Sequence, residues 1–597
     1  MSQQDNKDIS QYFYRASAVD FMKIPGSPVA YWATLNTRKC FERFPPLSQV
    51  GKATLGMNST NNLLFVRSWN EISIDRIEFG AIDEVSSARS SKKWFPYNKG
   101  GDFRKWYGNR EFVINWQDNG SDIHRFNNIP LTHRGAPVRS KQYQFKESAT
   151  WSFVSSSKFG VRYSPAGSMF DVGGSSYFAE KIPLKFIVGF LCSSVAFKFL
   201  NAINPTLNYQ VGNISSLPIA PNSDIRTLEV IDLLIDISKS DWNGYETSAD
   251  FELLPLLELS NSPPASTIYE HQRTIWLDIT AETQRLEQEN NRLFIEAYGL
   301  QDELTPDVPL EEITLTCNPH YRYGRNRTEE ERETLQQCDT IKELVSYAIG
   351  CMMGRYSLDK AGLILASQGE TLQDYLRQIP APRFAPDDDG ILPLTDQEWF
   401  ADDATNRFRE FIRIVWGDEH MKQNLDFVAE SLCLHAIKPP STRSGGESAL
   451  DTIRRYLSTQ FFKDHLRTYK KRPIYWLFSS GKHKAFECLV YLHRYHEGTL
   501  ARMRTEYVIP LSAKLNSYAE KLEQDKDASP SAAEIKRISN ELATLHKQQA
   551  ELAQFDEKLR HFADQRISLD LDDGVKVNYG KFGDLLAEVK AVTGEKA

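Results

Sequence analysis

Between residues 535 and 562 the apolar side chains recur at intervals of three and four, with one gap of seven, which restricts the segment to a long amphipathic helix. They are Ile535, Ile538, Leu542, Leu545, Leu552, Phe555, Leu559 and Phe562. The stretch Asp527–Ser531 contains a proline and separates this helix from an earlier helical stretch that begins near Ala485. Two long helices with so short a break are expected to fold back as an antiparallel coiled-coil hairpin over residues 485–566.

The remainder of the chain changes character near residue 240. Before it, short apolar runs at 63–66, 112–116 and 151–154 predict strands, and 184–201 predicts one buried helix. After it, apolar residues follow helical spacing almost throughout. We therefore expect an α+β chain in five parts: a mixed α/β domain at 1–240, a helical linker region at 241–340, a helical domain at 341–484, the hairpin at 485–566 and a tail at 567–597.

Length, cysteines and hydropathy narrow the class of protein. At 597 residues the chain exceeds a single ordinary core. Its seven cysteines are scattered and odd in number, which argues against a disulfide framework and favours a reducing cytoplasm. The longest apolar run, Phe186–Phe197, is too short to cross a bilayer, so no membrane partner is expected.

The most unusual composition lies at residues 92–110. Six cationic side chains, six aromatics and three glycines share nineteen residues with a single acid. Cations neutralise phosphate, aromatics stack on bases, and glycines allow close backbone approach to an anion. The alternative interpretation is a solvated basic loop beside an aromatic core.

The charge distribution favours nucleic acid. Although the net charge is −8, the stretch from Ser86 to Pro165 holds fourteen Lys and Arg against five Asp and Glu. A basic face on an otherwise acidic chain is the electrostatic footprint of a nucleic-acid site.

The sequence offers no catalytic or metal site. An adenine methyltransferase needs a glycine-rich turn after a strand and a polar residue before Pro-Pro-aromatic. Residues 261–265, Asn-Ser-Pro-Pro-Ala, lack the aromatic and are interpreted as a loop. Cys317 and His320 have no second ligand pair at zinc spacing, and residues 568–575 hold only a fragment of a calcium loop.

Six sequence blocks together resemble the C-terminal half of PglX, the adenine-specific DNA methyltransferase family of BREX phage-defence systems. They are Tyr14–Ala18 with Ile24–Trp32, residues 93–109, Leu207–Ile214, Ser346–Lys360, Lys471–Lys484 and Leu569–Tyr579. The resemblance implies that 1–240 is a DNA target-recognition domain and that the helical region follows it. It also implies that S-adenosylmethionine binds a methyltransferase half that is missing here, so that no cofactor is expected in this chain.

The expected partners are double-stranded DNA, a methyltransferase domain or subunit, and other BREX proteins. Residues expected to position DNA are Lys92, Lys93, Trp94, Tyr97, Asn98, Lys99, Arg104, Lys105, Trp106 and Arg110. Paired donors and acceptors read base edges, which suggests as readers Arg125, Asn127, Asn128, His133, Arg134, Arg139, Lys141, Gln142, Gln144, Lys158 and Arg162. A second basic patch comprises Arg467, Lys470, Lys471, Arg472, Lys482 and Lys484, and either clamps DNA or docks the methyltransferase half.

Three functions stay open at this point. The first is a recognition module that works with a methyltransferase half. The second is an interaction scaffold of a defence complex, in which the hairpin docks partners and DNA affinity is incidental. The third is a complete enzyme with an unrecognised site.

Overall fold

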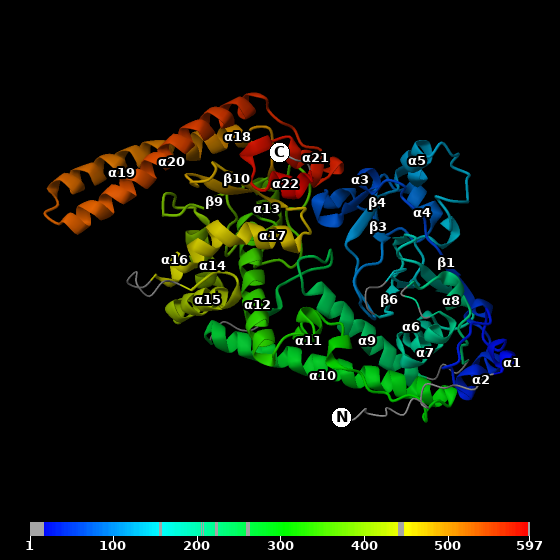
Figure 1. Cartoon of the computed structure of the whole chain (residues 1–597). Helices are drawn as coiled ribbons and strands as arrows, with labels where there is room; N and C mark the ends of the chain where they lie inside the picture. Colours follow the sequence, from blue (N-terminus) through cyan, green and yellow to red (C-terminus); the bar gives the residue numbers. More distant parts are fainter. Residues whose placement is uncertain are drawn as a thin grey trace, which may run out of the picture. The chain divides into compact units, whose positions relative to one another are not determined.

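A computed structural model describes residues 17–154, 158–204, 206, 208–220, 225–257, 263–439 and 447–594 (Figure 1). The chain divides into two compact units. Unit 1 comprises residues 1–66, 77–242 and 276–325, and unit 2 comprises residues 67–76, 243–275 and 326–597. The expected 1–240 domain therefore differs from unit 1 in two places, because 67–76 joins unit 2 and 276–325 joins unit 1.

A four-stranded antiparallel sheet forms one half of unit 1. Its order is β1 (Gly51–Thr54), β8 (Ser176–Ala179), β5 (Ser148–Trp151) and β6 (Val161–Ser164). Side chains from these strands pack with helices α6, α7 and α9 (Ile225–Asn243) and with α10 (Ala265–Tyr298) from residue 276 onward. The sheet thus gains its core from segments that lie more than a hundred residues apart in the sequence.

The single helix expected at 184–201 is two helices, α6 (Leu184–Cys192) and α7 (Ser194–Ile203), with a bend of 72° between them. Ser193 causes the break: its backbone is extended and its hydroxyl accepts a hydrogen bond from the Ala196 N–H, which caps α7. No single helix in the described part of the chain is long and apolar enough to cross a membrane.

A second small sheet forms the other half of unit 1. In it β3 (Trp94–Asn98) pairs antiparallel with β4 (Phe112–Asn115) and parallel with β7 (Met169–Phe170). Its core includes side chains of α5 (Gln117–Phe126) and of α3 (Asn62–Phe65). Residues 63–66, expected to be a strand, are mostly helical because Asn61 caps α3 through the Leu64 N–H. Short helix α4 (Glu84–Arg89) lies against α5.

A short helix, α8 (Val211–Ser215), follows α7. Beyond α10 the acidic stretch of unit 1 forms short turns and α11 (Pro319–Tyr323). This stretch was expected to be a linker. Glu312 and Thr314 instead bond to side chains and backbone of the β3–β6 region.

Unit 2 contains a three-stranded antiparallel sheet in the order β10 (Tyr475–Ser479), β11 (Glu487–Tyr491) and β9 (Ile391–Pro393). Pro393 lacks a backbone donor and is accommodated because β9 is an edge strand. The helices of unit 2 are α12 (Glu329–Met352), α13 (Leu372–Gln378), α14 (Ala404–Trp416), α15 (Met421–His435), α16 (Ala449–Tyr456) and α17 (Phe462–Thr468).

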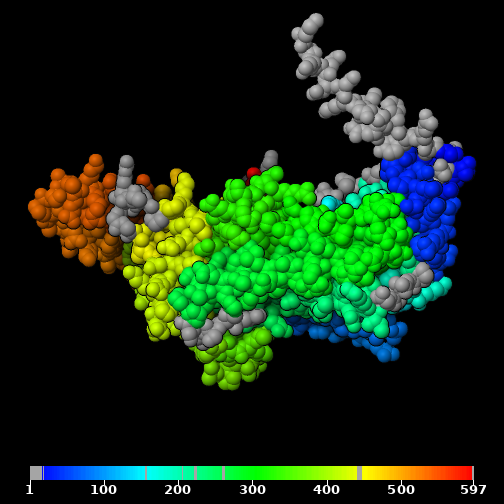
Figure 2. Space-filling model, turned by 90° about the horizontal axis from the view of Figure 1, so that it is seen from below, coloured from blue at the N-terminus to red at the C-terminus, as the bar shows by residue number. Residues whose placement is uncertain are grey.

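Unit 2 ends in a helical hairpin and a short tail. Helices α19 (Ile509–Ala528) and α20 (Ala532–Asp564) are joined by three residues and lie side by side. Their joined end projects from the unit (Figures 1 and 2, orange), while Glu551 of α20 accepts hydrogen bonds from the Ser480 hydroxyl and the His483 N–H. The hairpin starts later than expected, because residues 487–491 form β11 and helix begins again only at α18 (Thr499–Arg502). Helices α21 (Val575–Gly580) and α22 (Val589–Thr593) complete an α+β chain.

Candidate nucleic-acid interface

The block at 92–110 lies largely inside unit 1. Strand β3 buries Trp94, Tyr97 and Asn98. The Tyr97 hydroxyl donates to Asp171 Oδ2 at 2.7 Å, and Asn98 Nδ2 donates to Ser164 Oγ at 2.8 Å. These three residues were expected at the DNA surface. They instead pack the second sheet, because its strands need both faces covered.

Three residues further along the block are also buried. Arg104, Lys105 and Trp106 are 6%, 4% and 1% exposed. Arg104 contacts Asp241 Oδ2 at 3.4 Å and donates to Thr316 Oγ1 at 2.7 Å. Its guanidinium also lies 5.0 Å from the ring centre of Trp242. Arg104 and Lys105, expected to contact the DNA backbone, and Trp106, expected to pack or to stack on DNA, therefore lie inside the unit and bond to its other parts.

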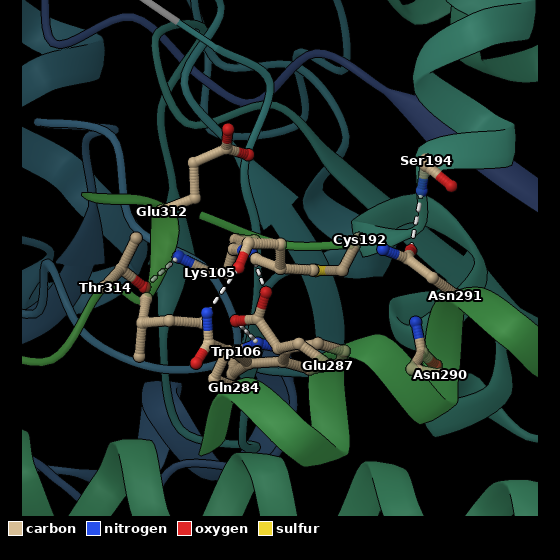
Figure 3. A network of polar contacts seen from close by, with 12 residues as sticks. Lys105, Trp106, Cys192, Ser194, Gln284, Glu287, Asn290, Asn291, Glu312 and Thr314 are labelled. Carbon is tan, nitrogen blue, oxygen red and sulfur yellow. Dashed lines mark hydrogen bonds and ion pairs between the residues drawn. The ribbon is translucent and has the colours of Figure 1, made fainter. Parts of the chain in front are cut away.

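Glu287 of α10 is the centre of this interior network (Figure 3). Its carboxylate forms an ion pair with Lys105 Nζ, and its Oε1 accepts a hydrogen bond from Trp106 Nε1 at 2.8 Å. Burial raises the pKa of Glu287, and the Lys105 ammonium opposes that rise. The Lys105 backbone N–H donates to Thr314 Oγ1 at 3.0 Å, which ties the same loop to the stretch after α10.

Two asparagines extend the polar face of α10 beyond Glu287. Asn290 Nδ2 donates to the Gly189 carbonyl at 3.0 Å, and Asn291 Oδ1 accepts from the Ser194 N–H at 2.9 Å (Figure 3). Sequence reasoning missed Glu287 and these neighbours. The sequence did contain a signal for this network: a row of polar residues lies along one face of a long helix whose other faces carry apolar residues.

The other cations of the block remain near the surface. Lys92, Lys93, Lys99 and Arg110 are partly exposed. Lys99 Nζ contacts Asp171 Oδ2 at 3.2 Å and Asn62 Oδ1 at 3.1 Å, so it lies beside α3. Of the six cations in the block, these four are the ones that the structure leaves partly exposed.

The expected base readers divide into three groups by exposure. Exposed are Arg125, Asn128, Arg134 and Gln142; partly exposed are Asn127, His133, Arg139 and Lys158; buried are Lys141, Gln144 and Arg162. Arg134 forms an ion pair with Glu84 at 2.8 Å, and Lys158 forms one with Glu312. Exposure therefore favours the residues at the end of α5, where Arg125 is exposed although it contacts Asp122 Oδ1 at 3.3 Å.

The three buried members build the loop and do not face solvent. Lys141 Nζ donates to the Leu131 carbonyl at 2.9 Å and lies 3.0 Å from His124 Nε2. Burial lowers the pKa of both Lys141 and His124, so the contact needs a neutral imidazole acceptor. Gln144 Oε1 accepts from the Phe170 N–H at 2.9 Å. Burial also lowers the pKa of Arg162 to about 10.

Residues 60–64 and 125–131 meet at one end of unit 1, and we call this pair of segments the tip. Asn127 joins them, because its Nδ2 donates to Thr60 Oγ1 at 3.1 Å and to the Ile123 carbonyl at 2.8 Å. The Phe65 and Phe126 rings meet edge to face at 5.4 Å. The tip holds four asparagines and Arg125 and has no acidic residue. In Figure 1 α5 lies at the end of unit 1 opposite α10.

The second basic patch is only partly available. In unit 2, Arg472 pairs with Glu71 at 2.6 Å, Lys484 pairs with Glu487 at 2.9 Å, and Arg467 contacts Asp464 at 3.1 Å. Lys470, Lys471 and Lys482 are exposed. Lys470 and Lys471 have φ of 50° and 64°, so the turn after α17 holds two successive lysines in the left-handed region.

A pocket of about 420 Å³ in unit 2 does not suit phosphate. Its lining includes Asp75, Glu497, Asp570 and Asp572 and a single arginine, Arg76. Arg76 is already paired with Asp572 at 2.8 Å. The 568–575 segment, which resembles a fragment of a calcium loop, thus uses Asp572 in an ion pair. Within the described ranges no group of three His, Cys, Asp or Glu could hold a metal ion.

The segment from β4 into α5 does not form a cradle for S-adenosylmethionine. That cofactor sits at a glycine-rich turn between a strand and a helix, and this segment holds one glycine, Gly120, which lies within α5. A Cβ atom at Gly120 would lie 2.5 Å from the Trp116 ring, so this glycine packs against an aromatic and opens no cradle. Residues 261 and 262 of the Pro-Pro segment lie outside the described residues.

Comparison with known protein sequences shows which proteins the chain is similar to. No protein-family model matches the chain. Over 581 residues the chain is 46% identical to the adenine-specific methyltransferase BrxX of Escherichia coli O9:H4 (strain HS). The chain resembles adenine-specific methyltransferases. It is also 36% identical over 592 residues to the adenine-specific methyltransferase PglX of Lacticaseibacillus casei (strain Zhang).

The two alignments cover nearly all of this chain but only part of each relative. Each covers 96% of this chain, but they cover 46% of BrxX and 45% of PglX. The chain therefore spans about half the length of the curated relatives it matches. Both units, including the buried network around Glu287 and the tip, fall within a length of sequence that the relatives share.

Proposed function

We propose that this chain supplies the DNA-recognition part of a BREX adenine-specific DNA methyltransferase. The observation that carries the proposal is the similarity to two adenine-specific methyltransferases over 96% of the chain. Methyl transfer from S-adenosylmethionine to adenine is then the task of a methyltransferase half that works with this chain.

The tip of unit 1 is the proposed reading surface. Arginine matches the acceptor pair of guanine, and asparagine matches the donor and acceptor of adenine. Arg125, Asn127 and Asn128 follow one another closely at the end of α5, and Lys99 lies nearby through its contact with Asn62. Lys99 and the partly exposed Lys92, Lys93 and Arg110 are proposed to contact the phosphate backbone.

Binding to a pool of random 30-base-pair duplexes, titrated in salt, tests this function. Fluorescence polarisation of the full chain is expected to show affinity that falls steeply with salt. A change of Lys99→Ala should reduce the salt slope by about one, because one phosphate contact is lost. Arg285→Ala is the matched control, since Arg285 is an exposed cation of unit 1 on α10, paired with Glu282.

Sequencing the bound fraction of the same pool tests reading as distinct from positioning. The wild-type chain should enrich one motif, and Asn128→Ala should relax the preference at one or two positions while the salt slope stays unchanged. Enrichment of no motif by the wild type would refute sequence reading. Salt-insensitive or absent binding would refute the proposed function itself.

The scaffold function has one observation in its favour. Six large apolar residues between 19 and 35 are exposed in unit 1: Val19, Met22, Val29, Tyr31, Trp32 and Leu35. Contiguous exposed apolar side chains mark protein–protein contacts more often than nucleic-acid contacts. Replacing Tyr31 and Trp32 together with serine should leave DNA binding unchanged and should weaken capture of a methyltransferase subunit.

A further inference from the structure

The tip carries an apolar group that base reading does not use. Leu63, Leu64, Phe126 and Leu131 are all exposed, and Phe126 is 49% exposed at the last position of α5. Single exposed apolar residues are normal on a protein surface, but a cluster within a polar, acid-free segment is not. The chain thus presents apolar side chains at the place where polar readers are proposed.

The Phe126 ring packs against a buried aromatic ring of the same unit. Phe65, which is buried, meets it edge to face at 5.4 Å. On either side, Arg125 is 78% exposed while it contacts Asp122 Oδ1 at 3.3 Å, and Asn127 is bonded across to Thr60. A supported ring that still exposes half its surface has the form of a wedge.

The turn that carries this ring is fixed by its backbone. The Asn127 N–H donates to the Ile123 carbonyl at 3.1 Å, the Asn128 N–H to Arg125 at 3.1 Å, and the Ile129 N–H to His124 at 3.0 Å. Lys141 holds the following residues through the Leu131 carbonyl. Because the segment is already ordered, insertion into a ligand would cost little additional conformational entropy.

We propose that Phe126 is an intercalating residue that enters the DNA stack between base pairs while Arg125 and Asn128 contact the neighbouring base edges. This inference rests on the proposed DNA-binding function. Apolar wedges flanked by polar readers partly unstack and unwind a duplex at the step they enter. Removing a base from its stack is easier at a distorted step, so the wedge would favour access of a methyltransferase to adenine.

DNA unwinding by the full chain measures insertion directly. A closed circular plasmid is relaxed by topoisomerase I with increasing protein, the protein is removed, and the linking number is read on a gel. The wild-type chain is expected to lower the linking number in proportion to the protein bound. Phe126→Ala should abolish most of this change and weaken plasmid binding by no more than about ten-fold, the loss of one stacking contact.

Two further variants distinguish insertion of the Phe126 ring from a general effect of exposed apolar side chains. Phe79→Ala is the control, because Phe79 is a phenylalanine of the same unit with similar exposure, 46%, and should unwind as the wild type does. Phe126→Trp keeps a flat apolar ring and should retain unwinding. Far-ultraviolet circular dichroism checks that each variant remains folded, as expected for a half-exposed side chain.

The outcomes distinguish this inference from the function beneath it. Salt-sensitive plasmid binding without any linking change would overturn the wedge and leave DNA recognition standing. Unwinding that persists in Phe126→Ala would also overturn it, because another part of the chain would then distort the duplex. Absence of plasmid binding by the wild type would overturn both.

Discussion

Removing the Glu287 carboxylate should destabilise unit 1 more than any change at its surface. Glu287→Ala leaves the Lys105 ammonium buried without an anion and leaves Trp106 Nε1 without its acceptor. Breaking a buried ion pair by removing one partner costs about 3–5 kcal/mol. A value of about 4 kcal/mol corresponds to a factor of about 10³ in the local opening equilibrium.

The reverse change should cost less. In Lys105→Met the Glu287 carboxyl still accepts from Trp106, and burial already raises its pKa, so it can take up a proton and lose its charge. We expect a loss of about 1–3 kcal/mol. The double variant Lys105→Met with Glu287→Gln buries no charge and keeps an acceptor for Trp106, so its stability should lie within about 1 kcal/mol of the wild type.

Native-state hydrogen exchange gives the opening free energy by region. Peptides covering residues 100–116 and 280–295 report on the network, and a peptide from α14 in unit 2 is the internal control. If Glu287→Ala and the double variant exchange at the same rate, charge burial is not the cause of the loss. Equal acceleration of the α14 peptide would show that the effect is global and not local to unit 1.

Two further changes test other parts of the chain. Burial lowers the pKa of His465 to about 3, and its Nε2 accepts from the Ile474 and Tyr475 N–H groups at 3.1 Å. Because the unfolded chain takes up a proton near pH 6.5, unit 2 loses stability as pH falls below that value, by about 2 kcal/mol per such histidine at pH 5. His465→Gln should remove this part of the pH dependence in urea unfolding between pH 7 and 5, and an unchanged slope would contradict the assignment. Truncation after residue 240 removes Glu287 and the part of α10 that packs into the core of the first sheet, while α6, α7 and most of α9 remain. We therefore expect weaker amide protection in β5 and β6 than in the full chain; equal protection would contradict the division into units.

Local spacing predicted the helical character of the chain after residue 240. An amphipathic helix such as α10, α14 or α15 is encoded in its own sequence. The split at Ser193 was not recognised, although Cys-Ser-Ser offers a cap that a continuous apolar run conceals. The strand prediction for residues 63–66 was wrong for a similar reason, because the helix cap at Asn61 outweighed their apolar character.

The site was harder to predict because burial depends on partners distant in the chain. Lys105 has every local mark of a phosphate-binding lysine, and its partner Glu287 lies 182 residues away. Composition therefore located a basic region correctly as a block but could not separate its internal cations from its external ones. The exposed Arg125 and Asn128 were identified from residue type alone, and nothing in the sequence distinguished them from the buried Lys141 and Gln144.

The interleaved order of the two units has a consequence for synthesis on the ribosome. Residues 1–66 belong to a unit that is complete only at residue 325, and residues 67–76 belong to one that continues to the end of the chain. At about 5–20 residues per second, the first strand waits roughly 13–50 s for its last partners to emerge. β1 pairs with β8, so on a nascent chain it stays without its strand partner until residue 179 has emerged, and the core around the two strands is complete only later.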